Sequence, residues 1–415
     1  MAARDRQLTS PQGLSLIGKL RLLFKFLFLA PPQLLLNILR CYTLALRRGI
    51  SLRFWLKCAY FRLGFGLLSP RELQFIQPST AAMYQSWLRR AQSKALAASR
   101  SGKDSDEKKA QAVFLASRLA VDIEILPDGK SSLLWIGDRK RAKKFVLFFH
   151  GGGYVVPAIR GHFEWCARAY LLSSQNVKSG GAEEGEEIAV AFLQYALSPD
   201  ATYPMQLQQA VDALFHILRM GTSPMNLIIG GDSAGGNLVA QLLSHILHPH
   251  PEVKGVTIPE PLAGAFLVSP WLSAKTHWFG YKRNGGIDMF DKNMIITHAP
   301  GVLGDVAKYD AEMAAGKGWS FPMDLPNVEG WFAGLETVVR NVYITAGEQE
   351  CFVDQCVGFA EAVKHGNPGM PVRLEVSRNE AHDWILMEAE HGVEGDATKR
   401  MKAWIREAFW PQSSS

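Results

Sequence analysis

The chain contains a serine whose neighbours favour nucleophilic chemistry. The stretch LIIGGDSAGGNLVA places Gly231, Asp232, Ser233, Ala234 and Gly235 in a G-x-S-x-G pattern. An apolar run of strand length precedes the pattern and a helix-like stretch follows it, so Ser233 is expected on a tight turn with its hydroxyl exposed. Glycine is required on both sides because a β-carbon would collide with the neighbouring strand and helix. The pattern predicts that Ser233 is a nucleophile.

A second glycine-rich motif ends another apolar run. In FVLFFHGGGYVV, His150 is followed by Gly151, Gly152 and Gly153. Each glycine costs about 0.5 to 1 kcal/mol of backbone order relative to alanine, so three in a row need a compensating function. Bare peptide N–H groups can stabilise the oxyanion that forms when a serine attacks an acyl carbonyl. We therefore expect an oxyanion hole at Gly152 and Gly153, completed by the amide of Ala234. His150 is interpreted as a residue that positions this loop.

A base and an acid that serve Ser233 are expected later in the chain. His382 lies in the polar turn of SRNEAHDWIL, between an apolar strand and the start of an apolar helix, and is the predicted base. The segment VYITAGEQECFVDQC offers Glu348, Glu350 and Asp354 as carboxylates that could hold the imidazole in the correct tautomer. Asp354 could alternatively cap the helix that follows.

No cofactor or metal site is expected. His245, His248 and His250 have a spacing that resembles a metal site, but they close a predicted helix ahead of a proline-containing loop. No phosphate-binding loop or dinucleotide fingerprint occurs in the sequence. The five cysteines are odd in number and scattered, so they are interpreted as free thiols in a reducing compartment. The lack of an Asn-x-Ser/Thr sequon favours a catalytic body that faces the cytosol.

Strand-length apolar runs alternate with helical stretches from residue 121 onward. The predicted strands are 121–126, 133–136, 145–149, 188–195, 227–230, 263–268, 342–346 and 372–376, and the predicted helices between them are 163–172, 205–220, 234–247, 356–365 and 398–408. This alternation predicts an α/β fold with a mostly parallel eight-stranded sheet and helices on both faces. Residues 272–335 lack strands and are rich in Trp, Phe, Met and Gly, which predicts a cap over one end of the sheet.

The positive charge is concentrated at the N-terminus. Residues 1–62 hold eleven of the 45 Lys and Arg residues but one of the 39 Asp and Glu residues, so they carry +10 and the remainder carries −4 of the net charge of +6. A mildly acidic body without a basic stripe excludes nucleic acid as the expected partner. Cations interleaved with Leu and Phe favour a segment that lies in an anionic membrane surface, as an interfacial or re-entrant piece. A true membrane span and a buried helical hairpin remain alternatives.

Taken in order, these motifs resemble the hormone-sensitive-lipase-like and arylacetamide-deacetylase-like branch of the α/β-hydrolase superfamily, which includes fungal-type esterases. The matching segments are HGGGY from His150, YALSPDATYPMQLQQAVDAL from Tyr195, GDSAGGN from Gly231, SPW from Ser269, and AGEQECFVD ahead of His382. They cover the chain from about residue 119 to its C-terminus. The resemblance implies an α/β-hydrolase fold and a helical cap that includes N-terminal helices. It also implies that the triad acid is Glu350, where the family usually has Asp, with Asp354 as the alternative acid.

The resemblance further implies a domain organisation and a location. Residues 1–66 are expected to be a membrane-associating segment that is separable from catalysis unless it closes the active site, 67–118 a helical cap part, and 119–415 the catalytic domain with its cap insertion at 272–335. The N-terminal extension resembles that of membrane-associated deacetylases, which suggests the endoplasmic reticulum or another internal membrane.

The predicted activity is hydrolysis of carboxylic esters through an acyl-enzyme, with short acyl or acetyl esters of an apolar alcohol as substrates. Two alternatives are an amide or N-acetyl deacetylase that uses the same triad and a non-catalytic small-molecule receptor. Aromatic residues in or beside the cap suggest a ring-containing substrate, although packing of the cap can also account for most of them: Trp271, Trp278, Trp319, Phe321 and Trp331.

Overall fold

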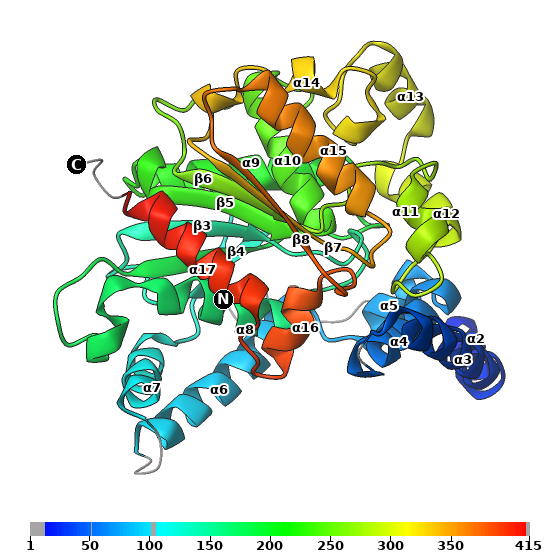
Figure 1. The fold of residues 1–415 in the computed structure, drawn as a ribbon, viewed down its shortest axis with the longest axis horizontal. Helices are drawn as coiled ribbons and strands as arrows, with labels where there is room; N and C mark the ends of the chain where they lie inside the picture. The colour runs from blue at the N-terminus through cyan, green and yellow to red at the C-terminus, as the bar shows by residue number, and fades with distance from the viewer. Residues whose placement is uncertain (1–12, 51, 101–104, 412–415) are drawn as a thin grey trace.

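The computed structural model describes residues 13–50, 52–100 and 105–411. Its centre is an eight-stranded sheet in the order β1-β2-β4-β3-β5-β6-β7-β8 (Figure 1). The strands are β1 (Ile123–Ile125), β2 (Ser132–Ile136), β3 (Lys144–Phe149), β4 (Ile188–Gln194), β5 (Leu227–Asp232), β6 (Gly264–Val268), β7 (Val342–Gly347) and β8 (Val372–Ser377). Strands β1 and β2 run antiparallel to their neighbours, and all other pairs are parallel. The predicted fold class is confirmed, and each predicted strand is present with ends within two residues.

Apolar residues on both faces of the sheet explain why helices cover it twice. In β3, Phe145, Leu147 and Phe149 belong to one buried cluster, whereas Val146 and Phe148 belong to another. Successive strand residues point to opposite faces, so an unbroken apolar run requires a hydrophobic layer on each side. The central strands are accordingly buried on both faces.

The helices around the sheet supply those two layers. Helices α9 (Met205–Arg219), α10 (Ala234–Leu247) and α15 (Val353–Gly366) contribute to the first cluster. Helices α6 (Thr80–Ser99), α8 (Arg160–Ala169) and α17 (Asp396–Phe409) contribute to the second, and Figure 1 shows α8 and α17 together on one side of the sheet. Helix α16 (Trp384–Glu390) follows the loop after β8 and packs on α8.

One long helical segment forms the described part of the N-terminus. Helix α2 (Leu16–Phe24) continues through a π-helical turn, η1 (Lys25–Leu29), into α3 (Ala30–Arg48). The segment stays helical across Pro31 and Pro32 because they lie in the first turn of α3, where a missing N–H costs little, and the π-turn adjusts the backbone before them. Among the described residues, Leu16–Arg48 alone is long and apolar enough to cross a membrane by length and composition.

Helix α4 (Leu52–Leu67) packs on α3 and joins the N-terminal segment to the cap. The buried Arg62 side chain donates hydrogen bonds to the carbonyl oxygens of Asp288 and Gly285, at 2.9 and 2.6 Å, and pairs with Asp291 at 2.6 Å. Lys25 pairs with Glu72 of α5 (Pro70–Ile76) at 2.6 Å. These buried pairs fix the N-terminal helices against the body, since a buried charge is costly to leave unpaired.

The segment between β6 and β7 is helical, as predicted for a cap. It contains α11 (Phe279–Asn284), α12 (Lys292–Leu303), α13 (Val306–Ala314) and α14 (Val328–Trp331). In Figure 1, α11 and α12 lie directly above the N-terminal helices, α13 lies above α11 and α12, and α14 lies at the upper end of α15.

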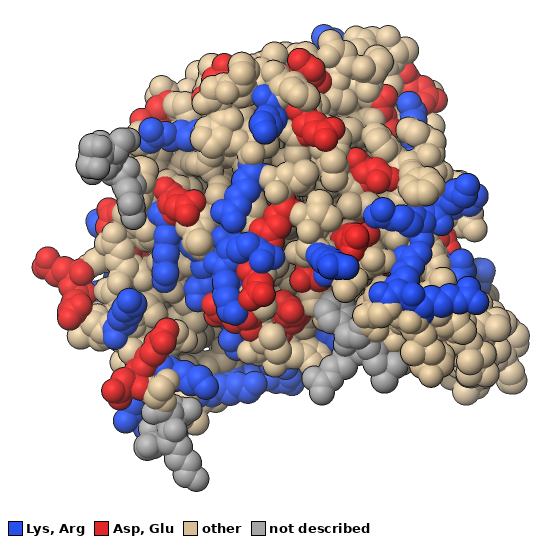
Figure 2. Space-filling model, in the orientation of Figure 1, with Lys and Arg blue, Asp and Glu red and all other residues tan. Residues whose placement is uncertain are grey.

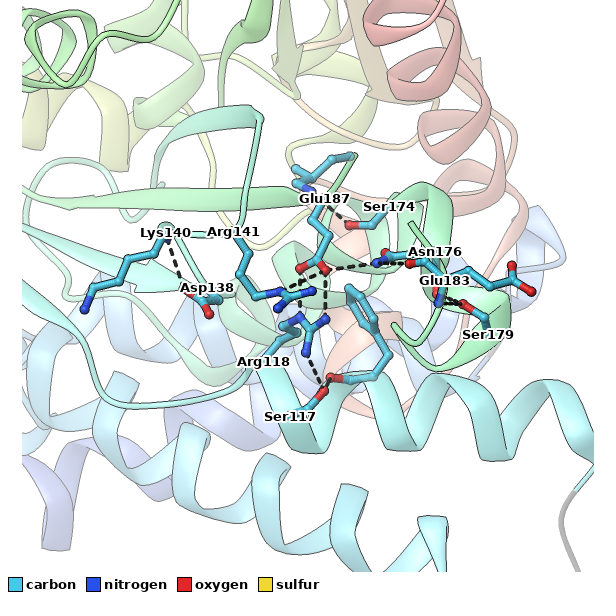
Figure 3. Close-up of polar contacts among 12 residues, drawn as sticks. Ser117, Arg118, Asp138, Lys140, Arg141, Ser174, Asn176, Ser179, Glu183 and Glu187 are labelled. Carbon is cyan, nitrogen blue, oxygen red and sulfur yellow. Dashed lines mark hydrogen bonds and ion pairs between the residues drawn. The ribbon is translucent and has the colours of Figure 1, made fainter. Parts of the chain in front are cut away.

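A buried ion pair fixes α7 (Asp106–Arg118) to the start of β4 (Figure 3). Arg118 donates two hydrogen bonds of 2.8 Å to the carboxylate of Glu187, and Asn176 donates a third at 3.0 Å. Burial alone would raise the pKa of Glu187, but these donors lower it. The glycine-rich acidic loop before β4 is thus held at the amino end of that strand, whereas Ser233 follows the carboxyl end of the parallel strand β5.

Candidate active site

Ser233 occupies the turn between β5 and α10. Its φ of 50° and ψ of −116° are rare for a residue with a β-carbon, so the backbone is strained there. The flanking glycines allow this turn: a β-carbon on Gly231 would lie 2.5 Å from the carbonyl oxygen of Phe149, and one on Gly235 would lie 2.0 Å from the same atom. The close approach of β3 to the turn therefore requires glycine at both positions.

His382 lies beside this serine. Its Nε2 atom is 2.9 Å from the Oγ of Ser233, and both side chains are almost completely buried. His382 comes from the loop between β8 and α16, 149 residues later in the chain. The tertiary structure thus brings the predicted nucleophile and base within hydrogen-bonding distance, which is the geometry that proton transfer requires.

Glu350, rather than Asp354, faces the imidazole. The Oε2 of Glu350 is 3.9 Å from the Nδ1 of His382, an ion-pair distance that is too long for a hydrogen bond. The same oxygen accepts hydrogen bonds from the Oγ of Ser269 at 2.6 Å and from the N–H of Gly347 at 2.9 Å. Asp354 instead accepts from the N–H of Gly280 at the start of α11. The role of triad acid stays a prediction for Glu350.

A second carboxylate contacts His382, and sequence reasoning missed it. The Oδ2 of Asp383 lies 3.1 Å from Nε2, the same nitrogen that faces Ser233. Asp383 has a left-handed backbone, with φ of 50°, and is buried. Burial raises the pKa of Asp383, and while burial alone would lower the pKa of His382, Asp383 and Glu350 together raise it well above its usual range. Only its place next to the predicted base in the sequence could have drawn attention to it.

Two of the predicted oxyanion residues, Gly152 and Gly153, line the same cavity as Ser233. Gly152 and Gly153 both have positive φ, 104° and 61°, which favours glycine. Ala234 begins α10, where helix N–H groups lack partners within the helix. Among the described residues, the N–H groups of Gly152, Gly153 and Ala234 donate no hydrogen bond to another protein group. They are therefore free to serve as donors to a ligand, although the oxyanion role itself stays a prediction.

The remaining motif residues support the loop. The Oδ2 of Asp232 accepts from the N–H of Gly151 at 3.0 Å and lies 3.1 Å from Nε2 of His162. His150 stacks on Tyr195 with ring centroids 4.4 Å apart, and its Nδ1 contacts the carbonyl oxygen of Gly151. Burial lowers the pKa of His150 to about 3, so its ring stays neutral. The structure places His150 beneath the glycine loop.

The cavity above Ser233 is narrow and almost entirely apolar, with a volume of about 100 Å³. Its walls come from the glycine loop, α16, α12, the loop before α12, and α4. The contribution of α4 is made by Phe61 and Phe65, from the segment that sequence analysis assigned to membrane association. Of the cap aromatics singled out above, Trp271 lines the cavity, whereas Trp319 and Trp331 pack against each other and against His250 and His248.

The three histidines with metal-like spacing have different partners, and the Nε2 of His250 lies 3.5 Å from a carboxylate oxygen of Glu312. Nε2 of His245 lies 2.9 Å from the carbonyl oxygen of Lys254, and Nε2 of His248 lies 2.8 Å from that of Trp331. In the part of the chain that the structure describes, no three His, Cys, Asp or Glu side chains are grouped in a way that could hold a metal ion.

Comparison with known proteins places this geometry in a family. Residues 146–386 match the family model described as alpha/beta hydrolase fold. The chain is similar to arylacetamide deacetylase of Oryctolagus cuniculus (29% identity over 121 residues, 28% of this chain and 27% of that protein). It is also similar to hormone-sensitive lipase of Homo sapiens (29% over 149 residues, 34% and 12%) and to an acetyl-hydrolase of Streptomyces hygroscopicus (26% over 148 residues, 36% and 42%). The chain thus spans less than half the length of each of these relatives.

Solved structures with the same fold have low sequence identity. Carboxyl esterase 2 of the fungus Tuber melanosporum superposes with a TM-score of 0.54 at 17% identity, over 70% of this chain and 86% of that one. A hormone-sensitive lipase from a metagenome library superposes with a TM-score of 0.53 at 17% identity, over 78% and 97%. At this identity the likeness shows a shared fold.

Proposed function

Because the chain belongs to the alpha/beta hydrolase fold family, in the hormone-sensitive-lipase-like and arylacetamide-deacetylase-like branch, we propose that it is a serine hydrolase that cleaves carboxylic esters. The observation that carries the proposal is the 2.9 Å contact between Ser233 Oγ and His382 Nε2 at the base of a buried apolar cavity. A strained serine turn, a histidine in contact and free N–H groups nearby are the parts that acyl transfer needs.

In the proposed reaction the Oγ of Ser233 attacks the ester carbonyl carbon while His382 takes the hydroxyl proton at Nε2. The carbonyl oxygen becomes an anion and accepts hydrogen bonds from the N–H groups of Gly152, Gly153 and Ala234. His382 then gives its proton to the departing alcohol, leaving an acyl-serine. A water molecule then attacks the carbonyl carbon of the acyl-serine while His382 takes its proton. His382 returns this proton to the Oγ of Ser233 as the acyl–oxygen bond breaks, which releases the acid and restores the hydroxyl.

We propose a small acyl group on an apolar alcohol as the substrate class. The cavity of about 100 Å³ has space for a short acyl chain, and its apolar walls favour an apolar alcohol. The relatives named acetyl-hydrolase and arylacetamide deacetylase support an acetyl group. The second of these names also favours removal of an acetyl group from an aryl amide as a second activity.

The test compares wild-type protein with Ser233→Ala. Wild-type protein is expected to hydrolyse p-nitrophenyl acetate and to react with a fluorophosphonate label, whereas Ser233→Ala loses about 10⁶-fold in turnover and takes no label. Ser93→Ala, which removes an exposed hydroxyl on α6, serves as the matched control and keeps both properties. A paired aryl acetate and aryl acetamide then decide between the two activities. Turnover by Ser233→Ala close to wild type would refute the proposal.

We also propose that the N-terminal helices bind an anionic membrane surface, at the endoplasmic reticulum or another internal membrane, with the catalytic body on the cytosolic side. Residues 13–50 contain six Lys or Arg and no Asp or Glu. Leu16, Ile17 and Leu20 are exposed by 74%, 79% and 59%, which is unfavourable in water. Each fully buried leucine gains about 1.5 to 3 kcal/mol, so these side chains alone can hold the protein on a bilayer.

A vesicle flotation assay tests membrane binding. Full-length protein is expected to float with vesicles that contain anionic lipid, and only part of the binding should be lost at high salt, because apolar contacts are not screened. Replacement of Leu16, Ile17 and Leu20 by Ser should abolish flotation, whereas Val121→Ser, at an exposed site before β1, should not. Wild-type protein that stays with the soluble fraction would contradict the proposal.

A further inference from the structure

The exposure of the cavity walls shows where the cavity opens. Most of the lining residues are buried; Gly152 and Gly153 of the glycine loop are partly exposed, and so are five residues that have side chains. Ile159 is one of these; the other four come from two helices, Phe61 and Phe65 from α4, and Met294 and His298 from α12. The Nε2 of His298 lies 3.2 Å from the carbonyl oxygen of Phe65, so the two helices meet at this point. The mouth of the cavity therefore lies between α4 and α12.

The outer surface next to this mouth is also apolar. Tyr60 of α4 is 67% exposed, with its ring centroid 6.1 Å from that of Phe61, and Ile296, on the outward face of α12 between Met294 and His298 in the chain, is 56% exposed. Both helices that line the mouth thus also carry an exposed apolar side chain on the outer surface. Helix α4 packs on α3, which exposes Leu35, Leu36 and Leu39 as further apolar residues of the proposed membrane face. Exposed apolar side chains in such number mark an interaction surface.

The charged residues around the N-terminal helices are distributed in a way that favours binding to an anionic bilayer. In Figure 2 the outer end of the N-terminal helices is almost free of charged atoms, and Lys and Arg predominate where these helices meet the cap. Arg48 of α3 donates hydrogen bonds to the carbonyl oxygen of Arg283 and to the side chain of Asn284. Arg47, Lys282 and Arg283 are exposed. In a bilayer, the apolar ends of the helices would contact the acyl chains, and the Lys and Arg residues next to them would contact the anionic headgroups.

We propose that the active-site cavity opens onto the membrane surface between α4 and α12, and that the enzyme takes a water-insoluble ester directly from the bilayer. The inference rests on the proposed ester hydrolysis and deepens it by naming the side from which substrate arrives. The substrate class is an ester of a membrane-resident alcohol whose acyl end passes between Phe61, Phe65 and Met294 to reach Ser233. Such a substrate moves from the bilayer to the cavity without leaving apolar surroundings, which avoids the cost of exposing it to water.

Fluorescent labels at the mouth test its orientation. All five native cysteines are buried, so a maleimide dye that reports polarity can be attached to the full-length variants Tyr60→Cys and Ile296→Cys. Vesicles that contain anionic lipid should shift the emission of both labels to the blue and raise it at least twofold. The emission of a label on the control variant Val121→Cys, at an exposed site next to the edge strand β1, should not change. Protein that floats with vesicles while both mouth labels stay in water would overturn the proposal, as would a failure to float.

A kinetic comparison tests the route itself. Two acetyl esters are used, p-nitrophenyl acetate in solution and the acetate of a sterol embedded in vesicles. Ile296→Asp should lower turnover of the embedded ester at least tenfold relative to that of the soluble ester, whereas Val121→Asp should leave this ratio unchanged. An unchanged ratio for Ile296→Asp would overturn the proposed route. If wild-type protein hydrolyses neither ester, the proposed ester hydrolysis fails, while the label experiment still decides the orientation of the mouth.

Discussion

The carboxylate of Asp383 should control the pH at which the enzyme works. In the proposed reaction His382 accepts the serine proton only when Nε2 carries no proton, but the carboxylate of Asp383 lies 3.1 Å from that nitrogen in a buried site. The negative charge of Asp383, together with that of Glu350, favours the protonated imidazole and raises the pKa of His382 well above its usual range. Activity should therefore rise with pH and reach its full value only above the ordinary histidine range of about 6.5.

The perturbation is Asp383→Asn, which removes the charge and keeps the shape. An opposite charge within about 4 to 6 Å shifts a pKa by about 1 to 3 units. Because Glu350 remains at 3.9 Å, part of the increase in the pKa of His382 persists, and the acidic limb of kcat/KM should move to lower pH. The variant should therefore be faster than wild-type protein at mildly acidic pH.

The assay is the pH dependence of kcat/KM for p-nitrophenyl acetate, with thermal unfolding of each variant as a check on folding. The control is Glu390→Gln, which neutralises a surface carboxylate that pairs with Lys57 at 3.6 Å and should leave the profile in place. An acidic limb that stays put or moves upward in folded Asp383→Asn protein would show that Asp383 does not hold the proton on His382.

Three further outcomes are expected. Glu350→Gln should lose far more turnover than Asp354→Asn, because only the first removes the charge that faces His382. The measurement is the kinetics of both purified variants, and the opposite order would assign the acid role to Asp354. Gly235→Ala should lower stability by about 1 to 3 kcal/mol or more, measured by thermal unfolding, because its β-carbon would overlap a β3 carbonyl; an unchanged melting temperature would argue against the tight turn. A chain that begins at Leu67 should lose turnover even of soluble esters, because α4 forms part of the cavity wall; full activity would show that the segment is separable.

Much of the fold could be predicted from sequence because its signals are local. The apolar runs that became β3, β4 and β5 are buried on both faces, and a parallel sheet between two helical layers is the arrangement that accommodates such runs. The turn at Ser233 could also be predicted from sequence. Glycines on either side of a serine, between a strand and a helix, are required because a β-carbon there would clash with a few neighbouring atoms. The order of the predicted nucleophile, acid and base along the chain could also be read from the sequence.

The tertiary structure determined which side chains contact each other in the site, and no local sequence pattern predicts these contacts. Asp383 faces Nε2 of His382 because its left-handed backbone directs the side chain back toward the cavity, which residue identity alone does not specify. Glu350 and Asp354 are four residues apart, yet they face His382 and Gly280 respectively, because helix α15 begins between them. The N-terminal segment was predicted by charge to meet a membrane, but only packing of α4 against α12 made it part of the active-site wall. Contacts between residues more than 200 positions apart depend on how every intervening element packs. Composition and hydrophobic periodicity do not specify that packing.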